Sequence, residues 1–195
     1  MTATLAPVAV RSRLQGRFGA PLYVYAERCS STQDLLPADA PEGALAVAEE
    51  QMRGRGRRGR DWQGAAGKGL LFSLCLRPQV ETARLASLTP VAAEAVVQAI
   101  AFFGGQATVK QPNDVLLAGK KVAGILAEAS GGRVALGLGV NVAQEASDLP
   151  ERPVFPASSL ALELGRSVDR VELLACILTR LESHYELWLA EAAAT

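Results

Sequence analysis

The sequence predicts an α+β protein, with helices packed on a mixed, mainly antiparallel sheet. Short apolar runs bounded by turn residues recur between residues 22 and 142, and helical patterns are confined to a few separate segments. Strands and helices therefore gather in blocks instead of alternating as in parallel α/β folds. With 195 residues, 49% hydrophobic and 21% charged, the chain suits a single globular domain over residues 1–195.

The first half of the chain contains three expected strands. Residues 22–26 and 44–48 are short apolar runs, with a short helix predicted between them at residues 31–36. A glycine- and arginine-rich island at residues 53–69 follows as a loop. Residues 69–76 are continuously apolar, which indicates a buried strand.

The second half begins and ends with a helix. Thr89 and Pro90 have the residue types of an N-cap and a first helical position, so we predict a helix from there to Phe103. Strands joined by turns are then expected at residues 107–110, 115–117, 121–129 and 134–142. Asp169 resembles the N-cap of a last, amphipathic helix whose apolar residues reach Trp188.

Composition excludes several classes of protein. Lysine plus arginine equals aspartate plus glutamate, 20 against 20, whereas nucleic-acid-binding proteins carry a broad basic excess. Cys29, Cys75 and Cys176 form no closely spaced pair, which argues against disulfides and zinc and favours reduced thiols in the cytoplasm. We also expect no membrane association, because no run approaches the roughly 18 apolar residues of a span.

The island holds five arginines in the eight residues from Arg53 to Arg60, with glycines between them. Glycines bring backbone N–H groups close to an anion, and guanidinium groups match phosphate or carboxylate. This pattern predicts a loop that closes over an anionic ligand. An RNA-binding segment of the arginine-glycine type or a plain solvated loop would have the same composition.

A second polar segment follows the first long helix. Lys110, Asn113 and Asp114 cluster around a proline, and Lys121 leads into an apolar strand. The lysines are suited to neutralising phosphate or carboxylate, and Asp114 to binding Mg²⁺ through oxygen. The alternative is an ordinary polar hairpin.

Small residues recur in the two strands after this segment. Gly124 interrupts one strand, and Gly137 and Gly139 interrupt the next, where a glycine often marks the close approach of a ligand. They predict a slot against the face of the sheet. Ser31 and Thr32, at the start of the first short helix, are either N-cap residues or hydroxyl ligands for a small polar group.

Taken together and in this order, these segments resemble the catalytic domain of biotin protein ligases, over roughly residues 22 to 190. The resemblance is carried by Ser31-Thr32, by Gly54 to Arg60 with Trp62, by Lys110 with Pro112 to Asp114, by Lys121 to Leu126 with Glu128, and by Gly137 to Asn141. It implies an ATP-dependent biotin–[acetyl-CoA-carboxylase] ligase. Such an enzyme activates biotin to biotinoyl-5′-adenylate and transfers it to a lysine of a carrier protein.

The resemblance also assigns roles to residues. It implies a biotin site formed by Ser31, Thr32, Gln51, Gly54, Arg55, Arg57, Lys121, Gly124, Gly137 and Gly139. It implies an ATP and adenylate site formed by Arg55, Arg57, Arg58, Arg60, Trp62, Asn113, Lys121 and Asn141. The groups implied in catalysis are Lys121, Arg57, Asp114, Lys110 and Asn113, with Asp114 also facing Mg²⁺.

Two positions depart from the family pattern: Gln111 replaces a tryptophan, and Gln33 replaces an asparagine. The family comparison leads us to expect no N-terminal helix-turn-helix, no C-terminal SH3-like barrel and no nucleic-acid partner. The expected partner is the biotin carrier domain of a carboxylase, and a homodimer is possible within the family. Three alternatives remain: a lipoate or octanoate ligase or transferase, a non-catalytic RNA-binding module, and a degenerate ligase that forms the adenylate but transfers it poorly.

Overall fold

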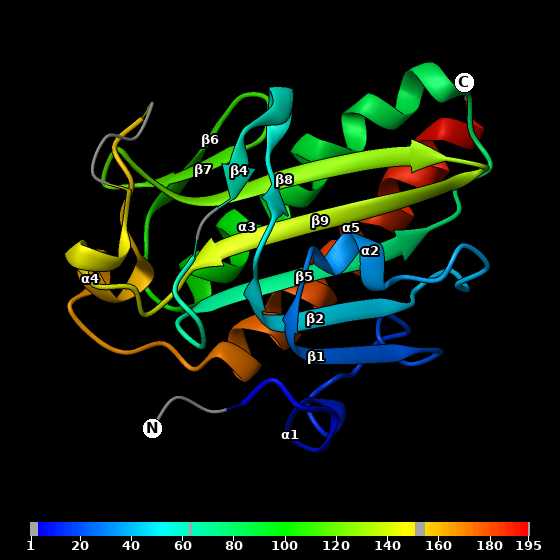
Figure 1. The fold of residues 1–195 in the computed structure, drawn as a ribbon. Coiled ribbons are helices and arrows are strands. Elements are labelled where there is room, and N and C mark those ends of the chain that lie inside the picture. Colours follow the sequence, from blue (N-terminus) through cyan, green and yellow to red (C-terminus); the bar gives the residue numbers. More distant parts are fainter. Residues whose placement is uncertain (1–3, 63, 151–154, 195) are drawn as a thin grey trace.

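A computed structural model describes residues 4–62, 64–150 and 155–194, and its main feature is a seven-stranded sheet (Figure 1). In spatial order the strands are β1 (Tyr23–Cys29), β2 (Leu45–Gln51), β5 (Gly69–Leu76), β9 (Arg133–Asn141), β8 (Lys120–Ser130), β7 (Asp114–Leu117) and β6 (Ala107–Lys110). Only β1 and β2 pair in parallel, and the other pairs are antiparallel. The predicted fold class is therefore confirmed.

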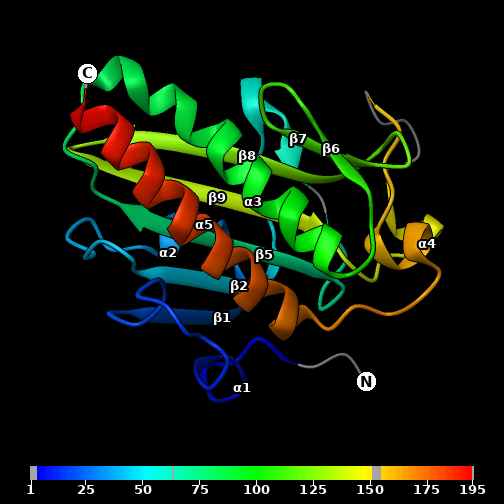
Figure 2. The same cartoon turned by 180° about the vertical axis from the view of Figure 1, so that it is seen from behind.

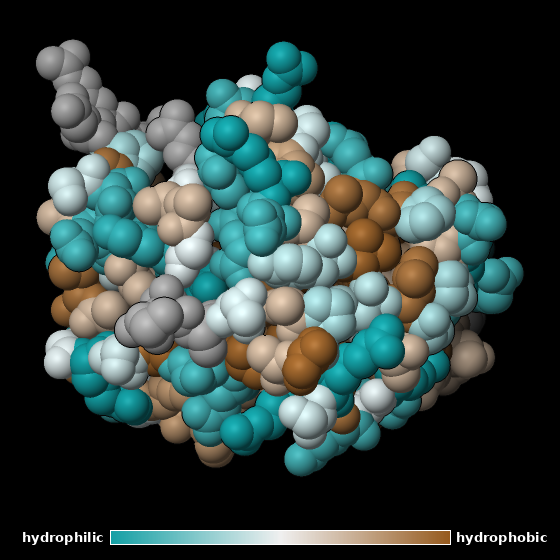
Figure 3. Space-filling view, turned by 60° about the horizontal axis from the view of Figure 1, so that its bottom comes forward, coloured by the Kyte–Doolittle hydropathy of each residue, from teal (hydrophilic) through white to brown (hydrophobic). Residues whose placement is uncertain are grey.

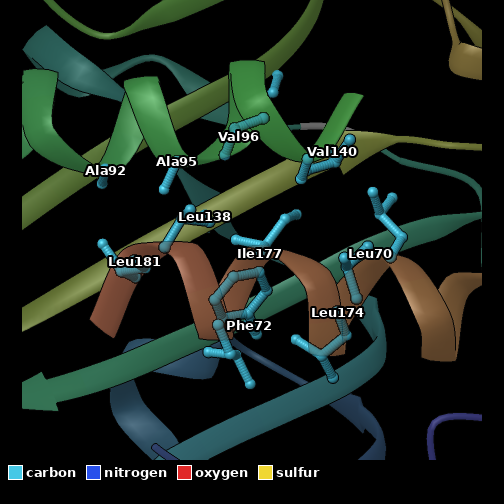
Figure 4. Packing of buried hydrophobic residues seen from close by; sticks show 14 of the residues in the cluster. Leu70, Phe72, Ala92, Ala95, Val96, Leu138, Val140, Leu174, Ile177 and Leu181 are labelled. Carbon is cyan, nitrogen blue, oxygen red and sulfur yellow. The ribbon is translucent and has the colours of Figure 1, made fainter. Parts of the chain in front are cut away.

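Two long helices, α3 (Leu88–Phe102) and α5 (Arg170–Ala193), cover one face of the sheet (Figure 2). Between the helices and the sheet lies the main core, where Leu138 and Val140 of β9 lie near Val96 and Ile177 of the helices (Figure 4). The opposite face carries the short helix α2 (Thr32–Leu35) and a separate hairpin, β3 (Gly54–Arg55) with β4 (Asp61–Trp62). That face is left open for a site.

Smaller elements complete the fold. The helix α1 (Pro7–Arg11) precedes β1, and α4 (Leu160–Leu164) lies between β9 and α5. Short 3-10 helices occur at Arg57–Gly59, Thr82–Ser87 and Ala146–Asp148. The sequence analysis predicted neither these short helices nor the β3–β4 hairpin.

The start of α3 differs from the prediction, whereas that of α5 agrees with it. The 3-10 turn at Thr82–Ser87 runs directly into α3, whose N-cap is Ser87 and not Thr89. Pro90 lies in the first turn, where a missing N–H costs no helical hydrogen bond. The side chain of Asp169 caps α5 as predicted, because it accepts from two backbone N–H groups of the first turn.

The expectation that no segment is long and apolar enough for a membrane span was wrong. The helical stretch Thr82–Phe102 has the length and the composition, with an 18-residue window whose mean hydropathy is 1.6. The core helix of a globular protein meets the same criterion, and Ala92, Val96 and Ile100 of this stretch are fully buried in the core between helices and sheet.

The face shown in Figure 3 is mostly hydrophilic, with apolar side chains in patches among polar ones. Cys29 and Cys75 are buried, Cys176 is partly buried, and all three are free thiols.

Candidate active site

A pocket with a volume of about 320 Å³ lies on the face of the sheet opposite α3 and α5. It brings together residues that are far apart in the sequence, from α2, the β3–β4 hairpin and strands β6 to β9. Of the residues singled out in the sequence, those that line it are Ser31, Thr32, Gln51, Arg55, Arg57, Arg58, Arg60, Trp62, Lys110, Asn113, Asp114, Lys121, Gly124, Gly137 and Gly139.

The structure places two predicted site residues outside the lining. Asn141 is 6% exposed, and its amide donates to the Ser158 carbonyl oxygen at 2.9 Å. Gly54 closes the base of the hairpin, where an added Cβ would lie 2.5 Å from the carbonyl oxygen of Trp62. Asn141 therefore holds the backbone at Ser158 in this structure. Gly54 allows the backbones of the two hairpin strands to approach closely.

One end of the pocket is a hydrogen-bonded cluster of uncharged polar groups. The Gln51 side-chain oxygen accepts from the backbone N–H of Thr32 at 2.7 Å and from its hydroxyl at 2.9 Å. The Thr32 hydroxyl also lies 2.7 Å from the hydroxyl of Ser73, a residue that the sequence analysis missed. Ser31 is the N-cap of α2, but its side chain makes no capping bond. The sequence left two hypotheses for Ser31 and Thr32, helix capping or a polar wall of a site. The contacts of Thr32 and the missing capping bond of Ser31 favour the polar wall.

The floor of the pocket is made of glycines. Gly124 of β8 pairs directly with Gly139 of β9, and Gly137 is two residues away on the same face. The Trp62 ring lies on this floor, so a Cβ at Gly139 would stand 2.4 Å from Trp62 Cε2, and one at Gly124 would stand 2.7 Å from Trp62 Cζ3. The glycines thus form the predicted slot, but in this structure the Trp62 ring and the Gln33 side chain fill it.

At the other end of the pocket, Lys121 and Asp114 form an ion pair. The Lys121 Nζ lies 2.6 Å from the Asp114 Oδ1, and both side chains are about a quarter or less exposed. The same Nζ is 5.4 Å from the centroid of the Trp62 ring, a cation–π distance. Asn113 is held beside them because its side-chain amide donates to the Ile125 carbonyl oxygen at 3.1 Å.

The arginine-rich island forms the β3–β4 hairpin, which crosses in front of β8 and β9 (Figure 1). Residues of this hairpin line the pocket. Arg55 does not reach toward the floor. It donates to the side-chain oxygen of Gln33 and forms ion pairs with Asp34 at 2.7 Å and Glu128 at 3.0 Å. Asp34, followed by Glu128, raises the pKa of the Arg55 guanidinium. Arg55 therefore anchors the hairpin to α2 and β8.

The remaining arginines of the hairpin are exposed at the mouth of the pocket. Arg57 Nη1 lies 3.5 Å from Asn113 Oδ1, and Arg58, at the tip, has a positive φ of 59°. Arg60 lies beside them in the lining. Their positive charge faces the same end of the pocket as Lys121, so this end is suited to an anion.

Two further pocket residues were not recognised from the sequence as part of a site. Gln33 was noted only as a departure, yet its amide donates to the carbonyl oxygens of Leu126 and Ala135 and so spans two strands. Phe155 lies under Lys110, whose Nζ is 3.4 Å from the ring centroid. No sequence signal marks Phe155, because it comes from an irregular segment.

A metal site made by the protein alone is not present in the described part of the chain. No three histidine, cysteine, aspartate or glutamate side chains gather there in a metal-binding group. Asp114 is nevertheless beside the anion-binding end, and one carboxylate is sufficient when phosphate and water supply the other ligands of Mg²⁺. Its role as a metal ligand stays a prediction.

The sequence profile described as the biotin/lipoate A/B protein ligase family matches residues 25–144, more than half of the chain. The chain belongs to this family. It is 40% identical over 172 residues to the bifunctional ligase/repressor BirA of Bacillus subtilis, covering 83% of this chain and 53% of that protein. It thus spans about half the length of that relative.

Two further members of the family support the assignment. The biotin–[acetyl-CoA-carboxylase] ligase of Paracoccus denitrificans is 40% identical over 171 residues, covering 77% of this chain and 71% of that protein. The solved structure of the biotin protein ligase from Aquifex aeolicus in complex with biotin and ATP is 30% identical, with a TM-score of 0.74, and the match covers 88% of this chain and 73% of that one. The resemblance stated from the motifs is confirmed at the level of family and fold.

Proposed function

We propose that this protein activates the carboxylate of biotin with ATP and transfers the biotinoyl group to a lysine of a carrier protein. The observation that carries the proposal is the polarity of the pocket. Uncharged hydrogen-bonding groups lie at one end, a flat glycine floor in the middle, and Lys121 with the arginines at the other end. Biotin has the same order: a neutral ureido ring, an apolar body and a carboxylate.

In this proposal each part of the pocket has one task. Thr32 and Gln51 bind the ureido group, with Ser73 holding the Thr32 hydroxyl, and the glycines allow the ring system to lie against the backbone once the Trp62 ring has moved off them. Lys121 and Arg57 neutralise the carboxylate and the α-phosphate. Positioning and charge stabilisation then suffice for catalysis, without a nucleophilic side chain.

The reaction proceeds in two displacements. A carboxylate oxygen of biotin attacks the α-phosphorus of magnesium-bound ATP, and pyrophosphate leaves. The deprotonated amine of the carrier lysine then attacks the acyl carbon, forming an amide and releasing AMP. Closure of the arginine-bearing hairpin over the pocket would exclude water from the mixed anhydride between the two steps.

The setting of the reaction belongs to the same proposal. The acceptor is the biotin carrier domain of a carboxylase, the protein works in the cytoplasm, and it requires neither nucleic acid nor membrane. The free thiols are compatible with a reducing compartment.

The test is acyl-adenylate formation by the purified protein with ATP and Mg²⁺, using biotin, octanoate and lipoate in parallel. Pyrophosphate release and the adenylate are measured, and a second set of reactions contains a biotin carrier domain. We expect adenylate with biotin only, and label on the carrier. Turnover of octanoate or lipoate without biotin would refute the biotin assignment and favour the lipoate members of the family.

A further inference from the structure

The segment of residues 155–159, here called the strap, runs along the first residues of β8. Lys121 donates its backbone N–H to the Pro156 carbonyl oxygen at 2.7 Å, and its own carbonyl oxygen accepts from the N–H of Ser158 at 2.9 Å. These two bonds form a parallel bridge between Lys121 and Ala157. The backbone of Lys121 is thus fixed from outside the sheet.

The strap also places a side chain in the pocket. Phe155, its first residue, lies 3.4 Å under the Nζ of Lys110. Lys110 and Lys121, the two lysines that line the pocket, therefore both depend on where the strap lies.

Three side-chain contacts hold the strap in place. The amide of Asn141 donates to the Ser158 carbonyl oxygen at 2.9 Å, and the Ser159 hydroxyl donates to the Gln144 carbonyl oxygen at 2.7 Å. The third contact is a hydrogen bond to a charged group: the carboxylate of Glu163, on α4, accepts from the Ser158 hydroxyl. The same oxygen of Glu163 is 2.8 Å from the Nζ of Lys120, the residue before Lys121.

Glu163 is unusual among the carboxylates near this site. Its side chain is only 10% exposed, and it lies outside the pocket lining. The hydrogen bond from Lys120, followed by that from Ser158, lowers the pKa of its carboxyl group. It is therefore ionised at neutral pH, and its charge joins the strap to the start of β8.

We propose that Glu163 is a positioning residue for the anion-binding end of the pocket. It acts through Ser158 and Lys120, which fix the strap and the backbone of Lys121, and it touches neither substrate nor reacting atoms. The kinetic part of this inference depends on the proposed function. A displacement of about 1 Å in such a site costs up to a hundredfold in rate, so losing Glu163 should reduce the rate by roughly tenfold to a hundredfold.

The experiment compares Glu163→Ala, Glu163→Gln and Ser158→Ala with the intact protein. We expect kcat for biotin adenylate formation to fall by the stated factor in Glu163→Ala, with a smaller effect on the Kd for biotin, because the uncharged end of the pocket stays in place. Ser158→Ala should reproduce part of the loss, and the double variant should lose less than the product of the two effects, because both residues act through one contact. Glu163→Gln keeps an acceptor for Ser158 and should lie between the intact protein and Glu163→Ala.

Glu182→Ala is the matched control. Glu182 is a similarly buried carboxylate, 15% exposed and paired with Arg17 at 3.2 Å. Like Glu163 it does not line the pocket, but it belongs to α5 and is not bonded to the strap. Equal losses of kcat in Glu182→Ala and Glu163→Ala would overturn the inference, since general destabilisation would then explain both.

Hydrogen exchange of the Lys121 and Ser158 backbone amides gives a readout that needs no activity. Both amides donate hydrogen bonds that join the strap to β8. We therefore expect faster exchange of both in Glu163→Ala and no change in Glu182→Ala. Unchanged exchange would overturn the inference even if biotin were a substrate. If the intact protein forms no biotin adenylate, the proposed function fails, and exchange alone then decides the role of Glu163. If Glu163→Ala does not fold, Glu163→Gln and Ser158→Ala provide the same comparison.

Discussion

Replacement of Gly139 by alanine is the most direct test of the glycine floor. Gly139 lies in the middle of β9, opposite Gly124, and faces the Trp62 ring. An alanine Cβ there would lie 2.4 Å from Trp62 Cε2 and 2.6 Å from Trp62 Nε1. These separations are far inside van der Waals contact, so the ring must leave its position.

The magnitude follows from where the strain can be relieved. Trp62 belongs to a hairpin outside the main sheet, so the ring can yield and the fold should lose less than about 1 kcal/mol. A ligand that takes the place of the Trp62 ring on the floor cannot yield in the same way. Overpacking by one methyl group costs about 1–3 kcal/mol, which corresponds to a roughly 5- to 150-fold weaker binding of biotin.

The assay is calorimetric titration with biotin, combined with the emission spectrum of Trp62 in a Trp188→Phe background. Gly64→Ala is the control, because a Cβ at Gly64 meets only Gln144 Nε2, at an ordinary 3.8 Å. We expect Gly139→Ala to bind biotin weakly and to shift the Trp62 emission, and Gly64→Ala to do neither. Binding within twofold of the intact protein would refute the floor as the ligand surface.

Three other perturbations have separate expectations. Lys121→Ala should lower the rate of biotin adenylate formation on the order of 10²–10³-fold, measured by pyrophosphate release, because it removes the cation that Asp114 holds at 2.6 Å; a loss below threefold would contradict this role. Glu49→Gln removes the carboxylate that lies 2.6 Å from the buried Arg170, and urea denaturation should show a loss of roughly 3 kcal/mol. Since contacts in the folded state lower the pKa of Glu163, its contribution to stability is present above the ordinary pKa of glutamate and is lost as the pH falls through the lowered value. The stability difference between the intact protein and Glu163→Gln should therefore shrink on acidification and stay constant from pH 6 to pH 8.

The glycine floor could be predicted because register follows from a turn. Gly131 and Gly132 both have positive φ values and join β8 to β9 as a two-residue turn, with Ser130 opposite Arg133. Regular antiparallel pairing from that turn brings Gly124 opposite Gly139. Glycines in two strands, joined by a turn that requires glycine, were thus sufficient to predict a slot.

The strap and the direction of Arg55 could not be predicted in this way. Phe155 and Glu163 reach the site through an irregular segment and a five-residue helix, which carry no periodic pattern. Arg55 has the composition of an anion ligand, but Asp34 and Glu128 are close enough to bind it first. Which arginines of an arginine-rich loop remain available is decided by neighbouring carboxylates, and those neighbours are known only once the chain is folded.

The pairing of Lys121 with Asp114 has a consequence for how the proposed site would accept ATP. An anionic ligand that binds Lys121 must come close to the Asp114 carboxylate, which lies 2.6 Å from the same ammonium group. Asp114 would then face phosphate oxygens of the same sign, which is costly in a partly enclosed pocket. In the proposed reaction, a cation that arrives with the nucleotide would remove this repulsion by taking Asp114 as one of its ligands. We therefore expect the ion pair to favour magnesium-bound ATP over free ATP.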